Sequence, residues 1–174
     1  MKTAYFVLPF TAILLAPATR GATIWNSAPL SFTKAPLADW TLPANQDHIT
    51  NNVWLTRAAT QGIFNIAAEA SYAHNSSPLG TEWAYGTTAN YSSLTYANWE
   101  AWHSNNPPAT VGQNAVVHLI TDDIYIDIKF DSWGNSAGAG FSYTRATATA
   151  PVPEPASLSL LASGVLLFSA RRRR

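Results

Sequence analysis

The chain has 174 residues and a formal net charge of zero, with ten Lys and Arg against ten Asp and Glu. Six of these cations lie near the two ends, so the segment between Ala22 and Val152 keeps four cations against nine acids, a net charge of −5. An acidic segment of this kind makes a poor nucleic-acid binder. The absence of cysteine from the sequence excludes disulfides, thiolate metal sites, a cysteine nucleophile and a lipid-modified N-terminal cysteine.

The first 22 residues have the pattern of a secretory signal peptide. Lys2 gives a short positive start and residues 4–15 form an apolar run. The small residues at the cleavage positions are Ala16, Ala18 and Ala22. The alternative is an uncut membrane anchor, but about twelve apolar residues give a helix of about 18 Å, short against a hydrocarbon core of about 30 Å. We therefore predict a signal helix over 1–22 that signal peptidase removes during export.

Residues 23–147 are predicted to form one all-β domain. About 130 residues remain once both ends are set aside, which is enough for one domain with its own core. Short apolar and β-branched stretches alternate here with turn-forming residues. In the first half of the domain the expected strands are 30–33, 53–57, 62–66 and 82–85. Seven or so short strands at this spacing favour an antiparallel β-sandwich or a jelly roll.

Two stretches of the same region have helical character. Residues 66–73 are rich in alanine, which favours a helical turn. Residues 95–103 are predicted to form a short helix capped by Ser92 or Ser93. The two asparagines and two prolines of residues 105–108 follow this helix and are expected to form a loop.

The clearest local prediction lies near the end of the domain. From residue 124 to 131, apolar side chains alternate with polar ones, as in a strand with one buried and one wet face. A β-branched run at 115–120 precedes it and is joined to it by a turn at 121–123, and a second alternating stretch at 141–145 follows a glycine-rich loop. This spacing predicts three antiparallel strands in a meander.

The last residues carry the most specific signal in the chain. Pro153-Glu154-Pro155 precedes an apolar run over 156–170, and the chain then ends in Arg171, Arg172, Arg173 and Arg174. The prolines favour extended backbone before the run, and the arginines favour the cytoplasmic side of a membrane. The fifteen residues of the run would span only about 22 Å. They therefore predict a short transmembrane helix that anchors weakly.

This arrangement of a Pro-Glu-Pro motif, an apolar run and basic residues resembles the PEP-CTERM sorting signal of Gram-negative bacteria, which a membrane-embedded exosortase processes. Residues 148–174 would then be a linker and sorting signal. The resemblance implies a membrane-tethered precursor, cleavage near Pro153-Glu154-Pro155, and transfer to the cell surface or the extracellular matrix of a biofilm. Glu154 would be a recognition residue for the processing enzyme. The alternative for the same residues is a permanent tail anchor.

The middle of the chain contains five characteristic stretches, at residues 77–84, 107–113, 118–127, 130–134 and 140–145. Together they resemble a recurrent, functionally uncharacterised domain of secreted bacterial proteins that carry such sorting tails. The likeness would cover most of residues 50–147. It implies an extracellular module and brings no activity with it.

The sequence does not favour an enzyme. Glycoside hydrolysis needs two carboxylates roughly 5 to 10 Å apart, and the candidates are Glu69, Glu82 and Glu100. The sequence contains neither Gly-x-Ser-x-Gly nor His-Glu-x-x-His, and its four histidines show no metal-ligand spacing. His118, within an apolar run, is expected to be a hydrogen-bonded structural histidine. We therefore expect no catalytic residues, and a secreted glycan hydrolase is the least favoured alternative.

A calcium site is a further alternative. Hard oxygen ligands suit this ion, and the candidates are Asp122, Asp123, Asp127 and Asp131. Asp127 and Asp131 share one face of the predicted strand but lie about 13 Å apart along it. The favoured interpretation is therefore a solvated acidic face, and no cofactor is expected.

Four aromatic residues outside the predicted strands offer a candidate glycan-binding site. They are Tyr91, Tyr96, Trp99 and Trp102. Exposed aromatic rings stack on sugar faces at little entropic cost. The alternative is that the rings fill the core, as expected for most of the seven tryptophans. The sequence thus predicts an exported surface or matrix protein with a structural or adhesive role, or alternatively a carbohydrate-binding module of the extracellular polysaccharide.

Overall fold

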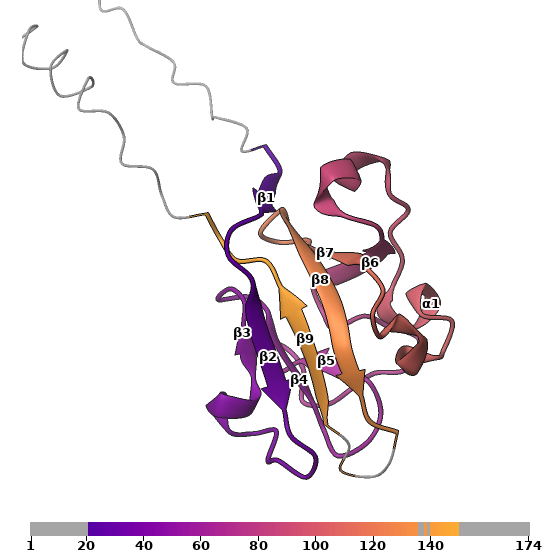
Figure 1. The fold of residues 1–174 in the computed structure, drawn as a ribbon. Helices are drawn as coiled ribbons and strands as arrows, with labels where there is room; N and C mark the ends of the chain where they lie inside the picture. The colour runs from indigo at the N-terminus through magenta and orange to yellow at the C-terminus, as the bar shows by residue number, and fades with distance from the viewer. Residues whose placement is uncertain (1–20, 136–137, 139, 150–174) are drawn as a thin grey trace, which may run out of the picture.

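The computed structural model describes residues 21–135, 138 and 140–149 (Figure 1). The described chain is mostly β-strand, arranged in two sheets, which confirms the all-β prediction. The predicted signal peptide, apart from its last two residues, and the predicted membrane helix at 156–170 lie outside the described residues. Within the ranges that the structure describes, no helix is both long enough and apolar enough to cross a membrane.

The larger sheet has six strands in the order β2-β9-β8-β7-β6, with β1 pairing in parallel with β8. Its strands are β1 (Thr23–Trp25), β2 (Leu30–Lys34), β6 (Thr81–Tyr85), β7 (Ala115–Leu119), β8 (Ile124–Trp133) and β9 (Phe141–Arg145). Strands β7, β8 and β9 pair antiparallel in sequence order, so the predicted meander is confirmed, and β6 extends it. β8 is longer than predicted because a register shift between Phe130 and Ser132 lets its pairing with β9 continue to Trp133.

The smaller sheet has three antiparallel strands in the order β3-β4-β5. They are β3 (Asp47–His48), β4 (Trp54–Arg57) and β5 (Ile63–Asn65). The sequence predicted β4 and β5 but missed β3 and β1. Both missed strands are too short to show the alternation that marks a strand in sequence, and they form because a longer partner strand is already in place.

The helical segments are short. They are η1 (Pro43–Asn45), η2 (Thr88–Ser93), α1 (Trp99–Trp102) and η3 (Pro107–Thr110). The helix predicted over 95–103 is limited to the four residues of α1. Its N-cap is Asn98, whose side chain accepts a hydrogen bond from the Ala101 amide, so the prediction of Ser92 or Ser93 as the cap is wrong. The predicted loop at 105–108 is interrupted, since Pro107 begins η3.

Residues 66–73 form turns and bends and contain no helix. The amides of Ala68 and Glu69 both donate to the carbonyl oxygen of Asn65, which closes one turn directly after β5. Further along, the Glu69 carboxylate accepts hydrogen bonds from the Asn65 and Leu79 amides, and so draws the chain back toward the strand. Side-chain hydrogen bonds that favour a compact loop therefore outweigh the helix propensity of alanine here.

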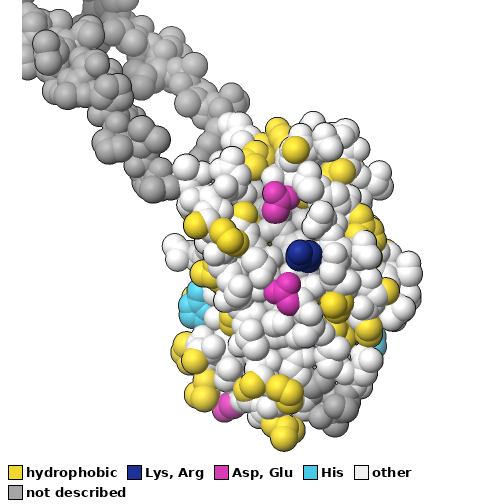
Figure 2. Space-filling view, in the orientation of Figure 1, with side chains coloured by type: hydrophobic (Ala, Val, Ile, Leu, Met, Phe, Trp, Pro, Cys, Tyr) yellow, Lys and Arg dark blue, Asp and Glu magenta, His cyan; other side chains and the backbone are white. Residues whose placement is uncertain are grey.

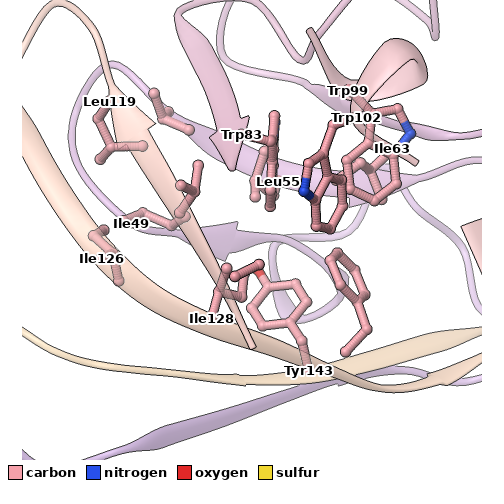
Figure 3. Packing of buried hydrophobic residues seen from close by; sticks show 14 of the residues in the cluster. Ile49, Leu55, Ile63, Trp83, Trp99, Trp102, Leu119, Ile126, Ile128 and Tyr143 are labelled. Atoms are coloured by element: carbon pink, nitrogen blue, oxygen red, sulfur yellow. The ribbon is translucent and has the colours of Figure 1, made fainter. Parts of the chain in front are cut away.

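One hydrophobic core lies between the two sheets (Figure 3). β4 and β5 contribute Leu55 and Ile63, while Ile126 and Ile128 reach the same cluster from β8. Trp83 on β6 packs against Trp99 and Trp102 of α1, with ring centroids 4.9 and 5.5 Å away. Burial of each such ring stabilises the fold by about 1.5–3 kcal/mol. The tryptophans therefore fix α1 against the sheet.

A buried polar network joins β3, an edge strand of the smaller sheet, to β9 of the larger sheet. The Asp47 carboxylate, on β3, accepts hydrogen bonds from Arg145 Nε at 2.6 Å and Arg145 Nη2 at 2.8 Å. The Tyr143 hydroxyl donates to the same carboxylate at 2.7 Å. All three side chains are buried. Burial, followed by the charge and hydrogen bond of Asp47, raises the pKa of Tyr143 well above its usual range, so the hydroxyl remains a donor.

Candidate functional site

The structure does not expose the two tryptophans of the predicted glycan-binding site. Trp99 is 0% exposed and Trp102 is 7% exposed. Their rings contact Trp83 and Phe130 inside the core (Figure 3). Neither ring is available to stack on a sugar, so this half of the prediction is corrected. The helix that carries them has an apolar partner, the inner face of β6, which the sequence pattern did not show.

The two predicted tyrosines lie elsewhere, on the outer face of the larger sheet. Tyr91 and Tyr96 both contact Tyr125, with centroid distances of 4.6 and 5.8 Å. Tyr125 in turn stacks on His118 at 4.0 Å. All three tyrosines are partly exposed. We call Tyr91, Tyr96, Tyr125 and His118 the tyrosine patch.

Hydrogen bonds fix the polar groups of the tyrosine patch. His118 Nδ1 lies 2.8 Å from Glu82 Oε1, and His118 Nε2 lies 3.3 Å from Asp123 Oδ1. His118 is therefore hydrogen-bonded on both ring nitrogens, as predicted. The Tyr96 hydroxyl donates to the Tyr91 carbonyl oxygen. Burial, followed by neighbouring acidic groups, raises the pKa of Tyr96 to about 12, so its hydroxyl stays protonated.

The four aspartates considered for calcium have separate hydrogen-bond partners. Asp122 accepts from the side chains of Thr50 and Asn52, and Asp127 accepts from the amide and hydroxyl of Thr88. Asp131 accepts from Thr144 on the neighbouring strand. Among the residues described, His, Asp and Glu form no group of three that fits a metal ion. The structure thus does not bring the predicted ligands together.

The three carboxylates considered for hydrolysis also have different hydrogen-bond partners. Glu69 holds the loop after β5 through two amide hydrogen bonds, whereas Glu82 belongs to the tyrosine patch surroundings through its contact with His118. Glu100, on α1, is buried and accepts from the Asn75 amide. Of the three, only Glu100 lines the cavity that lies beside the end of β4.

The surface of the described residues includes two cavities of functional interest. The smaller, of about 340 Å³, lies beside β1 and the end of β9 and includes Asp127 and Lys129. The larger, of about 520 Å³, lies beside the end of β4 and the last residue of β8. Its wall includes Arg57, Tyr72, His74, Glu100, His103 and Trp133. We call it the end cavity.

Arg57 is positioned in the end cavity by contacts with both sheets. Its Nε donates to the Gln61 carbonyl oxygen at 2.8 Å, and its Nη1 donates to the carbonyl oxygens of Gly134 and Gly140. The guanidinium also covers the Trp133 ring at 4.0 Å, a cation–π contact. Burial lowers the pKa of Arg57 to about 10, which still leaves the side chain charged at neutral pH.

The end cavity also holds two buried polar side chains on or next to α1. His103 is 4% exposed, and within the described part of the chain neither of its ring nitrogens has a hydrogen-bond partner. Burial lowers the pKa of His103, which favours its neutral form. Glu100 Oε1 lies 3.5 Å from His74 Nδ1, at the exposed rim. Cation, carboxylate, imidazole and aromatic groups thus meet in one place.

Sequence reasoning missed the end cavity for two reasons. Arg57 lies in a strand that was predicted, but a buried cation has no signature of its own in sequence. Trp133 would point to the wet face if the alternation of β8 continued unbroken, whereas the shift after Phe130 turns it toward the core and the cavity.

The comparisons with known proteins address the end of the chain. A family model described as the PEP-CTERM protein-sorting motif matches residues 151–174. The chain carries a PEP-CTERM sorting motif. The match includes Pro153, Glu154 and Pro155 and the four terminal arginines, all of which lie outside the described residues. Neither the curated proteins nor the solved structures gave a match.

The PEP-CTERM motif indicates the cellular location of the protein. It implies that the chain is exported, processed by exosortase and sorted to the cell surface. This agrees with the resemblance of the tail noted in the sequence. The resemblance of residues 50–147 to an uncharacterised secreted domain stays a prediction.

Proposed function

We propose that the protein is a structural or adhesive component of the extracellular layer, delivered there through its PEP-CTERM motif. In this proposal signal peptidase removes residues 1–22, and residues 156–170 hold the precursor in the inner membrane. Exosortase then cuts near Pro153-Glu154-Pro155. The match of residues 151–174 to the sorting motif supports the proposal most directly.

The described domain suits a passive role. Its charged side chains are sparse on the face seen in Figure 2, and its two sheets share one core in the manner of a β-sandwich. We propose that this domain is not an enzyme and needs no cofactor. The separate roles of Glu69, Glu82 and Glu100 support this, because hydrolysis of a glycosidic bond needs two carboxylates in one site.

Replacement of Glu154 by alanine is expected to remove most of the processed protein. The variant should accumulate in the inner-membrane fraction with its terminal arginines attached, because the processing enzyme reads the Pro-Glu-Pro motif. Fractionation of producing cells, followed by intact-mass measurement, checks this. Asp131→Ala, which removes an exposed acid of the domain, is the matched control and should be processed normally. Equal processing of Glu154→Ala and the unaltered protein would contradict the proposed route.

A carbohydrate-binding module is the second candidate function. The observation that favours it is the tyrosine patch, where Tyr91, Tyr96 and Tyr125 are partly exposed beside the carboxylate of Glu82. Aromatic rings next to hydrogen-bonding groups are the usual means by which proteins bind sugars. The extracellular polysaccharide of the producing cell would be the ligand.

The double variant Tyr91→Ala, Tyr96→Ala tests this second function. We expect it to lower retention on the producing cell's polysaccharide about tenfold, because a stacked ring contributes on the order of 1 kcal/mol. A pull-down of the purified protein measures the retention. Tyr85→Ala, which removes a tyrosine that is 45% exposed and lies outside the tyrosine patch, is the control. Unchanged retention in the double variant would rule out the tyrosine patch as the binding surface.

A further inference from the structure

We propose that the end cavity binds a sugar that carries a carboxylate, such as a hexuronate unit of an acidic polysaccharide. This inference assigns a second site, separate from the tyrosine patch, and it extends the proposed adhesive role by naming a ligand class. Four features of the cavity support the inference. They are, among the described residues, a buried cation with no carboxylate within ion-pair distance, a buried imidazole without hydrogen-bond partners, a single carboxylate and an aromatic lining.

The cation is Arg57. It is 4% exposed, yet among the described residues no carboxylate lies within ion-pair distance of its guanidinium. The acceptors of its Nε and Nη1 groups are neutral carbonyl oxygens. Buried charges in proteins are normally paired, and one that is not paired marks a candidate site for an opposite charge. Arg57 therefore favours an anionic ligand, and a guanidinium fits the planar geometry of a carboxylate.

A second cation strengthens this preference. Lys34, at the end of β2, is buried. Burial, followed by the nearby charge of Arg57, lowers the pKa of Lys34, although Asp39 opposes this shift. Lys34 pairs with Phe141, the residue after Gly140, whose carbonyl oxygen accepts from Arg57 Nη1, so both cations lie at this end of the molecule. An anion bound beside Arg57 would reduce the repulsion between them.

The remaining polar groups fit the hydroxyls of a sugar. Both ring nitrogens of His103 are buried without partners in the described structure, which is unfavourable unless a ligand supplies the missing hydrogen bonds. A neutral imidazole offers one donor and one acceptor, as a hydroxyl does. Glu100 Oε1 supplies a second acceptor near the rim, since the Asn75 amide occupies Oε2. The side chain of Asn105 also lines the cavity, and a side-chain amide can both donate and accept.

The walls and the size of the end cavity agree with one or a few sugar rings. Tyr72 and Trp133 supply aromatic surface to its lining. The volume of about 520 Å³ falls within the range of roughly 300–1,000 Å³ found for small-molecule sites. An inorganic dianion such as phosphate would leave the aromatic walls without contact and would meet the carboxylate of Glu100. A monoanion with several hydroxyls matches the set of groups better.

The test measures binding to the full-length chain, purified in mild detergent, by isothermal titration calorimetry. The probes are short oligomers of galacturonate, glucuronate and mannuronate, together with their methyl esters. An ester keeps the shape of the sugar but removes its charge. We expect at least one acidic oligomer to bind and its methyl ester to bind about tenfold more weakly or not at all.

The variant Gln61→Glu separates binding from folding. It adds a carboxylate to the lining of the end cavity, at the residue whose carbonyl oxygen accepts from Arg57 Nε, and keeps the size of the side chain. Gln61 is exposed, so the fold should tolerate the change. We expect affinity for the acidic oligomer to fall about tenfold or more, because the new carboxylate competes for the cation. Gln113→Glu makes the same chemical change at an exposed position outside the cavity and should bind normally.

The inference would be overturned by the absence of binding by every acidic oligomer, by equal binding of an acid and its methyl ester, or by unchanged affinity in Gln61→Glu. Inorganic phosphate that binds as tightly as the sugar acid would also overturn it, since the site would then recognise charge alone. The tyrosine patch variant should retain this binding, so failure here is distinguishable from failure of either proposed function.

Discussion

Replacement of Asp47 by alanine is expected to lower the free energy of unfolding by about 3–5 kcal/mol. Asp47 receives two hydrogen bonds from Arg145 and one from the Tyr143 hydroxyl, all in the buried region between the sheets. Without the carboxylate, the Arg145 guanidinium is left buried and unpaired, and that penalty exceeds the value of the lost bonds. Denaturant unfolding followed by tryptophan fluorescence measures the change.

Two further variants separate this explanation from a general effect of losing an acid. Asp131→Ala removes an exposed carboxylate that accepts one bond from Thr144, and it should cost at most about 1 kcal/mol. The double variant Asp47→Leu, Arg145→Met replaces the ion pair with apolar groups and should recover most of the stability. If Asp47→Ala unfolds at nearly the same denaturant concentration as the unaltered protein, the network does not hold the two sheets together.

Replacement of Trp99 by alanine is expected to cost about 3–5 kcal/mol of stability. The ring is fully buried and touches Trp83, Trp102 and Phe130, so its removal leaves a large hole in the core. Any accompanying loss of polysaccharide binding should follow the fraction of protein unfolded. Thermal denaturation and a pull-down on the same samples check both parts.

The variant Trp99→Phe gives a finer control. It keeps an aromatic ring and removes the indole N–H, which is buried without a hydrogen-bond partner in the described structure. We therefore expect a smaller loss of stability than for alanine. Trp40→Ala, at a partly exposed ring that makes an edge contact with Phe64, should also cost less. A stable Trp99→Ala protein that no longer bound polysaccharide would restore the original surface prediction.

Strands that alternate over several residues were predictable from the sequence. The stretch from 124 to 131 became most of β8, and 141–145 became β9 with the same bounds. Alternation reports burial directly, because successive side chains point to opposite faces of a sheet. The sorting signal was predictable for a different reason, since a processing enzyme reads it as a linear motif.

The end cavity and the core role of Trp99 depend on contacts between distant segments. Arg57 and Trp133 are far apart in sequence. They meet because the end of β4 lies against the residues that follow β8 and precede β9. Trp99 lies in a stretch with no strand pattern, so its partner Trp83 was not apparent. Sequence reasoning grouped the four aromatic residues in one segment, but it could not tell that the core would take the two tryptophans and leave the two tyrosines on the outer face of the sheet.

The two ends of the domain lie together at one pole, opposite the end cavity. Ser27 and Ala28 hydrogen-bond to Thr147, so the first and last described segments lie side by side (Figure 1). β9 runs toward this pole, while Trp133, at the far end of β8, lies at the opposite one beside Arg57. In the proposed membrane-tethered precursor, the domain is therefore attached at the pole opposite Arg57. The end cavity would then be free to meet matrix polymer before the tether is cut.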